Sequence, residues 1–223
     1  AEVSRLTAGT LTGGENALFV TGVTADNLTV TDVLALRSER LQNMALGPDG
    51  SRMPEGAAFL GLFPRDENGD GVTEVPEARE MQRFDEEGEQ QYYVVWRQYS
   101  ADGTAADVQS CYHNVEDGWN LKLPEEWSKA KLAAERTVGA DESAVSFYRV
   151  SASGRRSKVL TIYRLTGSMR EELAGLGDRF TLTRQVEAVY AAEIGDIWNV
   201  QLTEQSLRDR FSLIMAEWVM GDN

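Results

Sequence analysis

The chain has 223 residues, and 42% of them are apolar, so it is long enough for two modest domains and too apolar for a disordered protein. Its 36 acidic residues outnumber 22 Lys and Arg residues, and the formal net charge of -14 argues against nucleic acid and anionic lipid surfaces as partners. A single cysteine excludes an intramolecular disulfide, and no apolar run is long enough for a membrane-spanning segment.

The N-terminal part has the pattern of short strands. Residues 16–36 combine β-branched and apolar residues and are interrupted by one polar turn, which predicts two strands. Residues 38–46 suit either a strand or a short helix. Residues 57–63, AAFLGLF, predict a short apolar strand that leads into an acidic segment.

That segment, RDENGDGVTEVPEARE at residues 65–80, has the spacing of an oxygen-ligand metal loop. The pattern D-x-[DN]-x-[DN]-G-x5-E is met, with a glycine, Gly71, at position 6. Alternate residues of a tight loop can turn several oxygens inward, and Ca²⁺ takes six to eight oxygen ligands. The candidate ligands at positions 1, 3, 5, 7, 9 and 12 are Asp66, Asn68, Asp70, the Val72 carbonyl, Glu74 and Glu77.

The residues around the loop exclude a helix–loop–helix hand, because Pro64 precedes the loop and Pro76 lies inside it. LFPRDENGDGVTEVP, residues 62–76, resembles the calcium loops of FG-GAP and VCBS repeats of bacterial surface proteins. The resemblance covers residues 15–100. It implies a loop between strands of a β-propeller blade, with Glu74 as the last acidic ligand and Glu77 as a bystander. A closed propeller needs four or more blades, so the chain would hold a fragment of one.

After the loop, residues 77–91 are polar and are expected on a solvated surface. Residues 92–100 and 108–115 predict a β-hairpin. Further strands are expected at residues 119–124, 144–150, 158–165, 179–183 and 186–194, while residues 129–138 suit strand or helix.

Two helices are predicted near the C-terminus. Residues 168–177 have Ser168 as a candidate N-cap, Glu171 at the capping-box position and a terminal glycine. A second helix is expected after Thr203, because five apolar residues recur there at helical spacing. They are Leu207, Phe211, Ile214, Met215 and Trp218.

The predicted fold class is therefore α+β. A mainly antiparallel β segment at residues 1–114, a propeller-blade-like fragment, would be followed by an α+β sandwich at residues 115–223 with a C-terminal helix. The segment GWNLKLPEEW, residues 118–127, faintly resembles the opening strand of PsbP/Mog1-like sandwiches, and this resemblance implies a fold without an activity.

Other chemistries have weaker support in the sequence. Cys111 and His113 share a face of a predicted strand, but no third group suggests a catalytic pair. Glu125 and Glu126 are adjacent, so they would not face each other across a cleft as glycosidase carboxylates do. The five tryptophans could stack on sugars, although their apolar neighbours favour a core position.

These patterns predict a non-enzymatic, exported bacterial protein with a structural Ca²⁺ loop, located outside the cell or at its surface. It would bind or display an unknown protein or glycan ligand, and a lipid anchor on a longer parent chain is left open. The alternatives are a carbohydrate-binding accessory module and, less favoured, a hydrolase.

Overall fold

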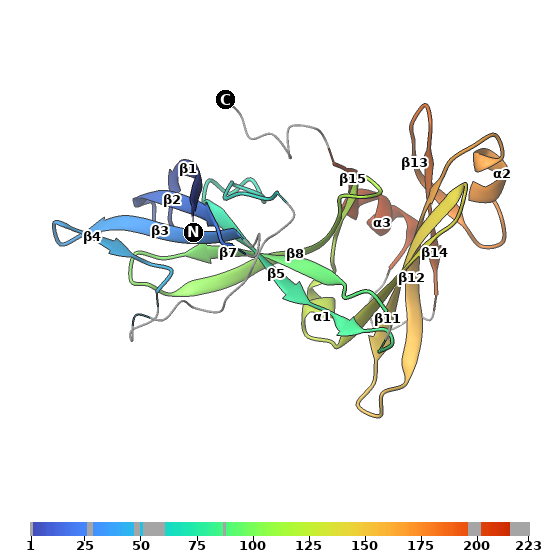
Figure 1. The fold of residues 1–223 in the computed structure, drawn as a ribbon, viewed down its shortest axis with the longest axis horizontal. Coiled ribbons are helices and arrows are strands. Elements are labelled where there is room, and N and C mark those ends of the chain that lie inside the picture. The colour runs from blue at the N-terminus through green and yellow to red at the C-terminus, as the bar shows by residue number, and fades with distance from the viewer. Residues whose placement is uncertain are drawn as a thin grey trace. The chain divides into compact units, whose positions relative to one another are not determined.

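The computed structural model describes residues 2–25, 29–46, 50, 61–86, 88–195 and 202–214. The protein is mainly β, which confirms the β-rich part of the predicted fold class, and its helices are short (Figure 1). In chain order, its elements are β1 (Glu2–Thr10), β2 (Asn16–Val23), β3 (Thr29–Arg37), β4 (Arg40–Asn43), β5 (Glu74–Glu80), β6 (Gln82–Arg83), β7 (Tyr92–Tyr99), β8 (Ala105–Asn114), β9 (Trp119–Lys122), α1 (Glu125–Ser128), β10 (Leu132–Val138), β11 (Glu142–Val150), β12 (Arg156–Leu165), α2 (Arg170–Ala174), β13 (Phe180–Arg184), β14 (Val189–Ile194), α3 (Glu204–Arg210) and β15 (Phe211–Leu213).

The described residues form two compact units. The first contains residues 2–79 and 93–111, and the second contains residues 80–92 and 112–214, in each case where they are described. Residues 80–92 and 112–114 of the predicted first domain thus belong to the second unit. The strands β7 and β8 pair antiparallel, which confirms the predicted hairpin, and their residues are divided between the two units.

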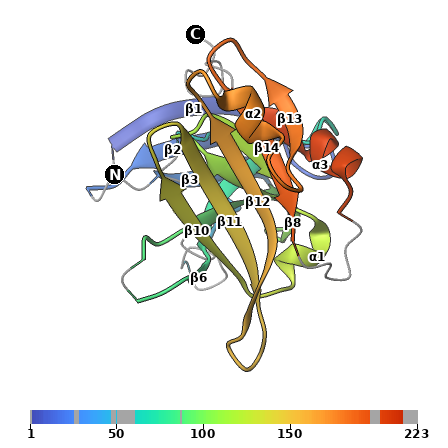
Figure 2. The same ribbon diagram turned by 90° about the vertical axis from the view of Figure 1, so that its right-hand side faces the viewer.

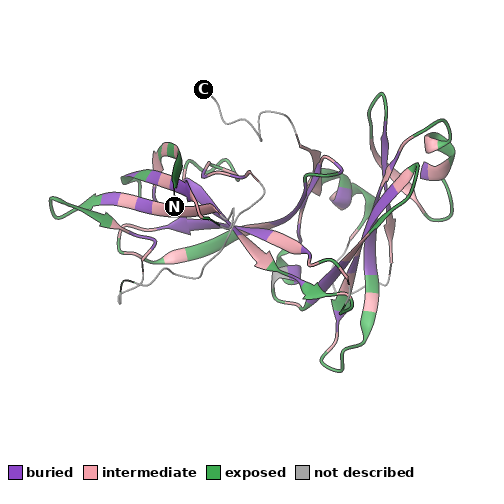
Figure 3. Cartoon of the chain, in the orientation of Figure 1, coloured by how far each residue is buried: buried purple, intermediate pink, exposed green. Residues whose placement is uncertain are grey.

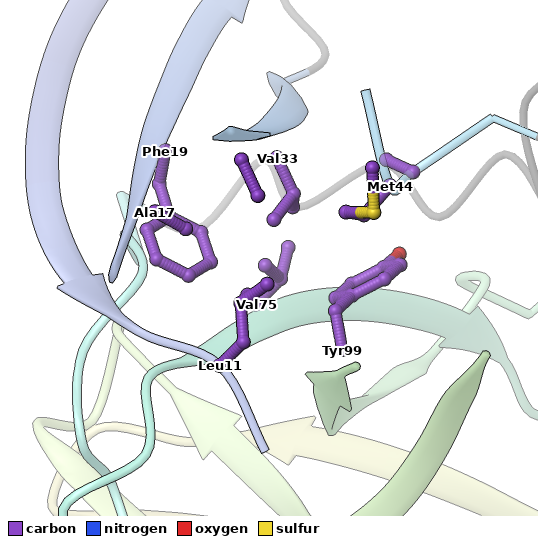
Figure 4. Close-up of a cluster of buried hydrophobic side chains, with 9 residues drawn as sticks. Leu11, Ala17, Phe19, Val33, Met44, Val75 and Tyr99 are labelled. Carbon is purple, nitrogen blue, oxygen red and sulfur yellow. The ribbon is translucent and has the colours of Figure 1, made fainter. Parts of the chain in front are cut away.

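The first unit packs a four-stranded antiparallel sheet, in the order β1-β2-β3-β4, over residues from β5 and β7. Strict alternation along β2 and β3 turns Phe19 and Val33 inward, where both are fully buried. Figure 4 shows them meeting Val75 of β5 and Tyr99 of β7 in one apolar cluster. Because Val75 directly follows Glu74, this cluster adjoins the base of the acidic loop.

The second unit is built on a six-stranded sheet, in the order β13-β14-β12-β11-β10-β6 (Figure 2). All its pairs are antiparallel except β10 with β6. Of residues 129–138, which suited strand or helix, residues 132–138 form β10, and α2 packs on β12 and β14. Aromatic rings fill the interior of the second unit. The ring centroid of Tyr112 lies 5.0 Å from that of Phe147 and 5.5 Å from that of Trp119.

Several local predictions need correction. Ser168 does not cap α2: Met169 occupies the N-cap position without a side-chain hydrogen bond, and the helix ends at Ala174 with Gly175 as its C-cap, before the predicted terminal Gly177. Residues 61–63 are not a strand, and residues 57–60 lie outside the described part. The polar stretch after residue 77 is not wholly solvated, because Met81 is buried.

The predicted C-terminal helix is also shorter than expected. It begins at Thr203, which forms a capping box with Ser206, but it ends at Arg210. Phe211 continues as β15 and pairs with Leu121 of β9, and its ring lies 5.9 Å from that of Trp119. Strand pairing and aromatic packing override the helical spacing here. Met215 and Trp218, the last two residues of the predicted stripe, lie outside the described residues.

Candidate metal centre

The acidic loop is closed at its base by backbone hydrogen bonds. Arg65 and Glu74 form an antiparallel bridge, with N–H to carbonyl distances of 3.1 and 2.8 Å. Between them the chain reverses through Gly69 and Gly71, whose φ angles of 81° and 86° lie in the left-handed region that side chains disfavour. The loop therefore leads directly into β5, but residues 61–64 before it are not a strand, so the predicted loop between strands is met only on its C-terminal side.

Three carboxylates converge inside this loop. Asp66, Asp70 and Glu74, here called the triad, each offer an oxygen, and these oxygens all lie within 4.8 Å of one another. Asp66 and Asp70 are exposed, whereas Glu74 at the base is fully buried. Three like charges at this spacing repel one another unless a cation or hydrogen-bond donors compensate them.

Backbone amides supply part of that compensation. Asp66 accepts from the N–H groups of Gly69, Asp70 and Gly71 at 2.7–3.1 Å. Asp70 accepts from the Val72 N–H at 2.8 Å, and Glu74 accepts from the Glu67 N–H at 2.7 Å. These donors fix the carboxylates in place while leaving lone pairs for a further partner.

The side chain of Gln98 on β7 supplies further hydrogen bonds to the triad. No sequence pattern had suggested this residue. Its Nε2 donates to Asp70 and to Glu74, each at 2.7 Å, and the residue is 9% exposed. Its amide nitrogen lies between two triad carboxylates at a distance little longer than the ~2.3–2.6 Å of a Ca²⁺–oxygen bond. A polar side chain in the buried second half of an apolar strand is the one signal that could have identified it.

The electrostatics of the triad differ from member to member. Burial raises the pKa of Glu74, and the charges of Asp70 and Asp66 act in the same direction against the hydrogen bonds from Glu67 and Gln98. In contrast, hydrogen bonds from Val72, Asn68 and Gln98 lower the pKa of Asp70. The buried base of the loop is thus the place where an unneutralised negative charge costs most.

The other predicted ligands occupy different positions. Asn68 lies in the loop, where its amide donates to Asp70 at 2.9 Å and its carbonyl accepts from the Asp70 N–H. Val72 also lies in the loop, and its carbonyl stays a predicted ligand. Glu77 is not brought to the triad: it lies three residues along β5 from Glu74 and contacts Arg97 at 3.2 Å.

Glu77 belongs to a second charged cluster in the same unit, here called the arginine network: Glu77, Arg79, Arg97 and Asp107. Arg97 donates to Glu77 at 3.2 Å and to Asp107 at 2.7 Å, and Arg79 lies 2.9 Å from Asp107. Burial raises the pKa of Glu77 against the lowering effect of both arginines. Burial also acts on Asp107, but the hydrogen bonds from the arginines hold its pKa below the ordinary value.

Among the described residues, no arginine or lysine pairs with the triad in the way that Arg79 and Arg97 pair with the carboxylates of the arginine network. None of the three triad carboxylates forms an ion pair within the described ranges; the donors that reach them are backbone N–H groups and the amides of Asn68 and Gln98. The donor set is made of hard oxygens without histidine or cysteine, which suits Ca²⁺ or Mg²⁺ rather than zinc or copper.

The remaining candidate residues lie in or near cores. Trp96, Trp119 and Trp127 are each 1% exposed, so they offer no surface for a sugar, and Trp198 and Trp218 lie outside the described residues. Cys111 and His113 are buried on β8, and His113 Nδ1 lies 3.2 Å from Asn120 Oδ1.

The adjacent acids Glu125 and Glu126 lie exposed on α1, where Glu125 pairs with Lys129 at 2.7 Å. No helix in the described part of the chain is long and apolar enough to cross a membrane. Comparisons with protein families, with curated proteins and with solved structures found no match.

Proposed function

We propose that residues 66–74 form a structural Ca²⁺ site in a non-enzymatic protein that a bacterium exports for binding or display at the cell surface. The observation that carries the metal site is the triad: three carboxylates converge, one of them is fully buried, and the donors that reach them from the described residues are neutral. A divalent cation among these oxygens would neutralise the charge that the fold concentrates there.

The site is proposed to act as a cross-link within the first unit. Asp66 and Asp70 belong to an exposed loop, whereas Glu74 opens β5 and Gln98 lies on β7. An ion held between them would tie the loop to the sheet beneath it. Rotation of the Gln98 carboxamide by half a turn would replace its N–H donors with its oxygen and add one neutral ligand.

An exterior location agrees with the expected strength of such a site. Extracellular calcium modules bind with Kd on the order of 10⁻⁴ to 10⁻³ M, which is useful only where calcium is abundant. The resemblance of residues 62–76 to FG-GAP and VCBS loops supports the same assignment. We therefore propose a role in stability for the metal, and not one in signalling.

The proposal is tested by thermal unfolding of the wild-type protein with calcium and with the chelator EGTA. With a Kd of about 10⁻⁴ M, about 10 mM Ca²⁺ would stabilise the folded state by roughly 2.7 kcal/mol, which raises Tm by several degrees. A parallel titration with Mg²⁺ reports on selectivity, because Mg²⁺ demands a stricter octahedral geometry. Identical melting in calcium and in EGTA would refute the site.

Asp70→Asn is the matched loss-of-function variant. It removes one charge from the triad and keeps the shape of the side chain, so the calcium-dependent rise in Tm should fall to less than a third of the wild-type value. Asp102→Asn is its control, because Asp102 is also an exposed loop aspartate that accepts a backbone hydrogen bond, from Thr104 at 2.9 Å. The control variant has the same net charge and should keep the full calcium response.

A further inference from the structure

The four-stranded sheet of the first unit has a second face that no described element covers. Its inner face holds Phe19, Val33 and Ala35 in the core. Period-two alternation therefore turns Leu18, Leu34 and Leu36 outward, and Figure 3 shows exposed and half-buried positions along these strands. This outward side of β1–β4 is here called the outer face.

Strand register joins the outward residues into one apolar surface. Leu6 pairs with Val20, Leu18 with Leu34, and Leu36 with Leu41, so each pair shares the outer face. The exposed fractions are 61% for Leu6, 38% for Leu18, 73% for Leu36 and 65% for Leu41. Sheets with one solvated face usually carry polar residues there, so this pattern is the reverse of the ordinary one.

The outer face is also almost free of charge. Among the outward residues of the described strands, only Asp32 is ionisable, and its carboxylate accepts a hydrogen bond from Asn43 at 2.9 Å. The whole chain, in contrast, carries a formal charge of -14. Large apolar surfaces rimmed by polar residues mark interaction sites.

We propose that the outer face packs against the same face of a second copy of this chain. Strands of 9, 8, 9 and 4 residues lying about 4.8 Å apart span roughly 500 Å² in projection, and protruding leucines expose more than the projection. The face thus approaches the ~800 Å² per partner of a stable interface. Two twisted sheets stack face to face at about 10 Å when both faces are apolar.

Chemistry favours a second copy over other occupants. Nucleic acid and anionic membranes require cations, and sugars stack on exposed aromatic rings, but the outward positions of the described strands β1–β4 carry neither, since Phe19 points into the core. A second copy supplies an apolar surface of the same width with the same low charge.

Sedimentation velocity of the wild-type chain and two variants tests the dimer. Wild type is expected to be dimeric at about 100 µM, and Leu18→Glu should raise the dimer Kd at least about thirtyfold, because it places a charge in the centre of an apolar contact. Val186→Glu is the control: Val186 is 89% exposed in the second unit, so the same substitution there should leave the Kd unchanged.

A second outer-face variant protects the test against misfolding. Leu36→Lys changes a side chain that is already 73% exposed, so circular dichroism should show a folded protein that still dissociates more readily than wild type. A wild-type chain that stays monomeric, whatever else it binds, overturns the proposal. So does a dimer that both outer-face variants leave intact. Calcium plays no part in this contact, so EGTA should not change the dimer Kd.

Discussion

The triad and the arginine network lie on neighbouring parts of the same unit, and each contains a buried glutamate. In the network, Glu77 faces the guanidinium group of Arg97. In the triad, Glu74 receives from the described residues the amide N–H of Glu67 and the carboxamide of Gln98, and neither donor is charged. One cluster carries its cation within the chain, while the other is arranged as if the cation came from solution. In the network, the folded chain itself compensates the buried charge. In the triad, a bound ion would compensate it.

Removal of Arg97, the cation that the chain itself places beside Glu77, should have the largest effect on the free energy of unfolding. Arg97→Met leaves Glu77 buried with a reduced share of positive charge, and loss of one partner of a buried ion pair costs about 3–5 kcal/mol in free energy of unfolding. Urea unfolding should show the same loss in calcium and in EGTA, because the network does not depend on a metal. A loss confined to one of these two conditions would contradict the separation of the clusters.

Arg79→Met is the matched control for that variant. The Arg79 side chain is 32% exposed, and its ion-pair partner Asp107 is 41% exposed, so water can replace the lost contact. Its cost should be about 1 kcal/mol or less.

A lysine at position 98 should make the triad resemble the network. In Gln98→Lys the ammonium group would lie among the carboxylates, where the Gln98 amide now donates to two of them at 2.7 Å. We expect the metal-free protein to gain about 1 kcal/mol, since a charged donor makes stronger hydrogen bonds than an amide. The calcium-dependent rise in Tm should disappear.

Gln98→Met is the corresponding control. It keeps the length of the side chain but removes both hydrogen bonds, so the metal-free protein should be less stable than wild type. Calcium should restore part of the loss, because the triad carboxylates remain. If Gln98→Lys and Gln98→Met respond to calcium equally, position 98 does not face the ion.

The sequence predicted that the three triad carboxylates would lie together in one loop, and they do, while the metal itself stays a prediction. The spacing of Asp66, Asp70 and Glu74 and the turn glycine Gly71 follow from one short segment, because loop geometry is decided by neighbouring residues. Gln98 could not be found in this way: it lies 24 residues from Glu74, and only the pairing of strands brings the two together. Arg97, the partner of Glu77, could not be predicted for the same reason, because it lies 20 residues further along the chain.

The same difference holds for the fold: elements decided by neighbouring residues were predicted, and elements decided by distant contacts were missed. Apolar stretches rich in β-branched and aromatic residues, such as β2, β11 and β12, were predicted because their composition favours strands locally. The strand β1 was missed, since a register shift between Val3 and Arg5 interrupts its period-two pattern and its apolar residues Leu6 and Ala8 face outward. The end of α3 was missed because Phe211 follows its partners on β9 and not the helical spacing before it.

The smallest expected difference between the clusters is their response to pH. Burial raises the folded-state pKa of Glu74, so its contribution to stability is complete below its unfolded pKa of about 4.5 and is lost as pH rises through the folded pKa. Calcium binds the ionised carboxylate, so the calcium-dependent rise in Tm should grow over the same pH window. The lowered pKa of Asp70 acts at lower pH, where stability is lost as pH falls.

Glu74→Gln isolates this contribution. The pKa of Glu77 is also raised by burial, so the wild-type protein without metal should lose stability from both glutamates as pH rises above about 4.5. Thermal unfolding between about pH 4.5 and 8 should show a shallower loss in Glu74→Gln, with no growth of the calcium response. A Glu74→Gln variant with the full wild-type calcium response at every pH would place the ion away from the buried base of the loop. The carboxylates of Asp66 and Asp70 would then be its only acidic ligands in the triad.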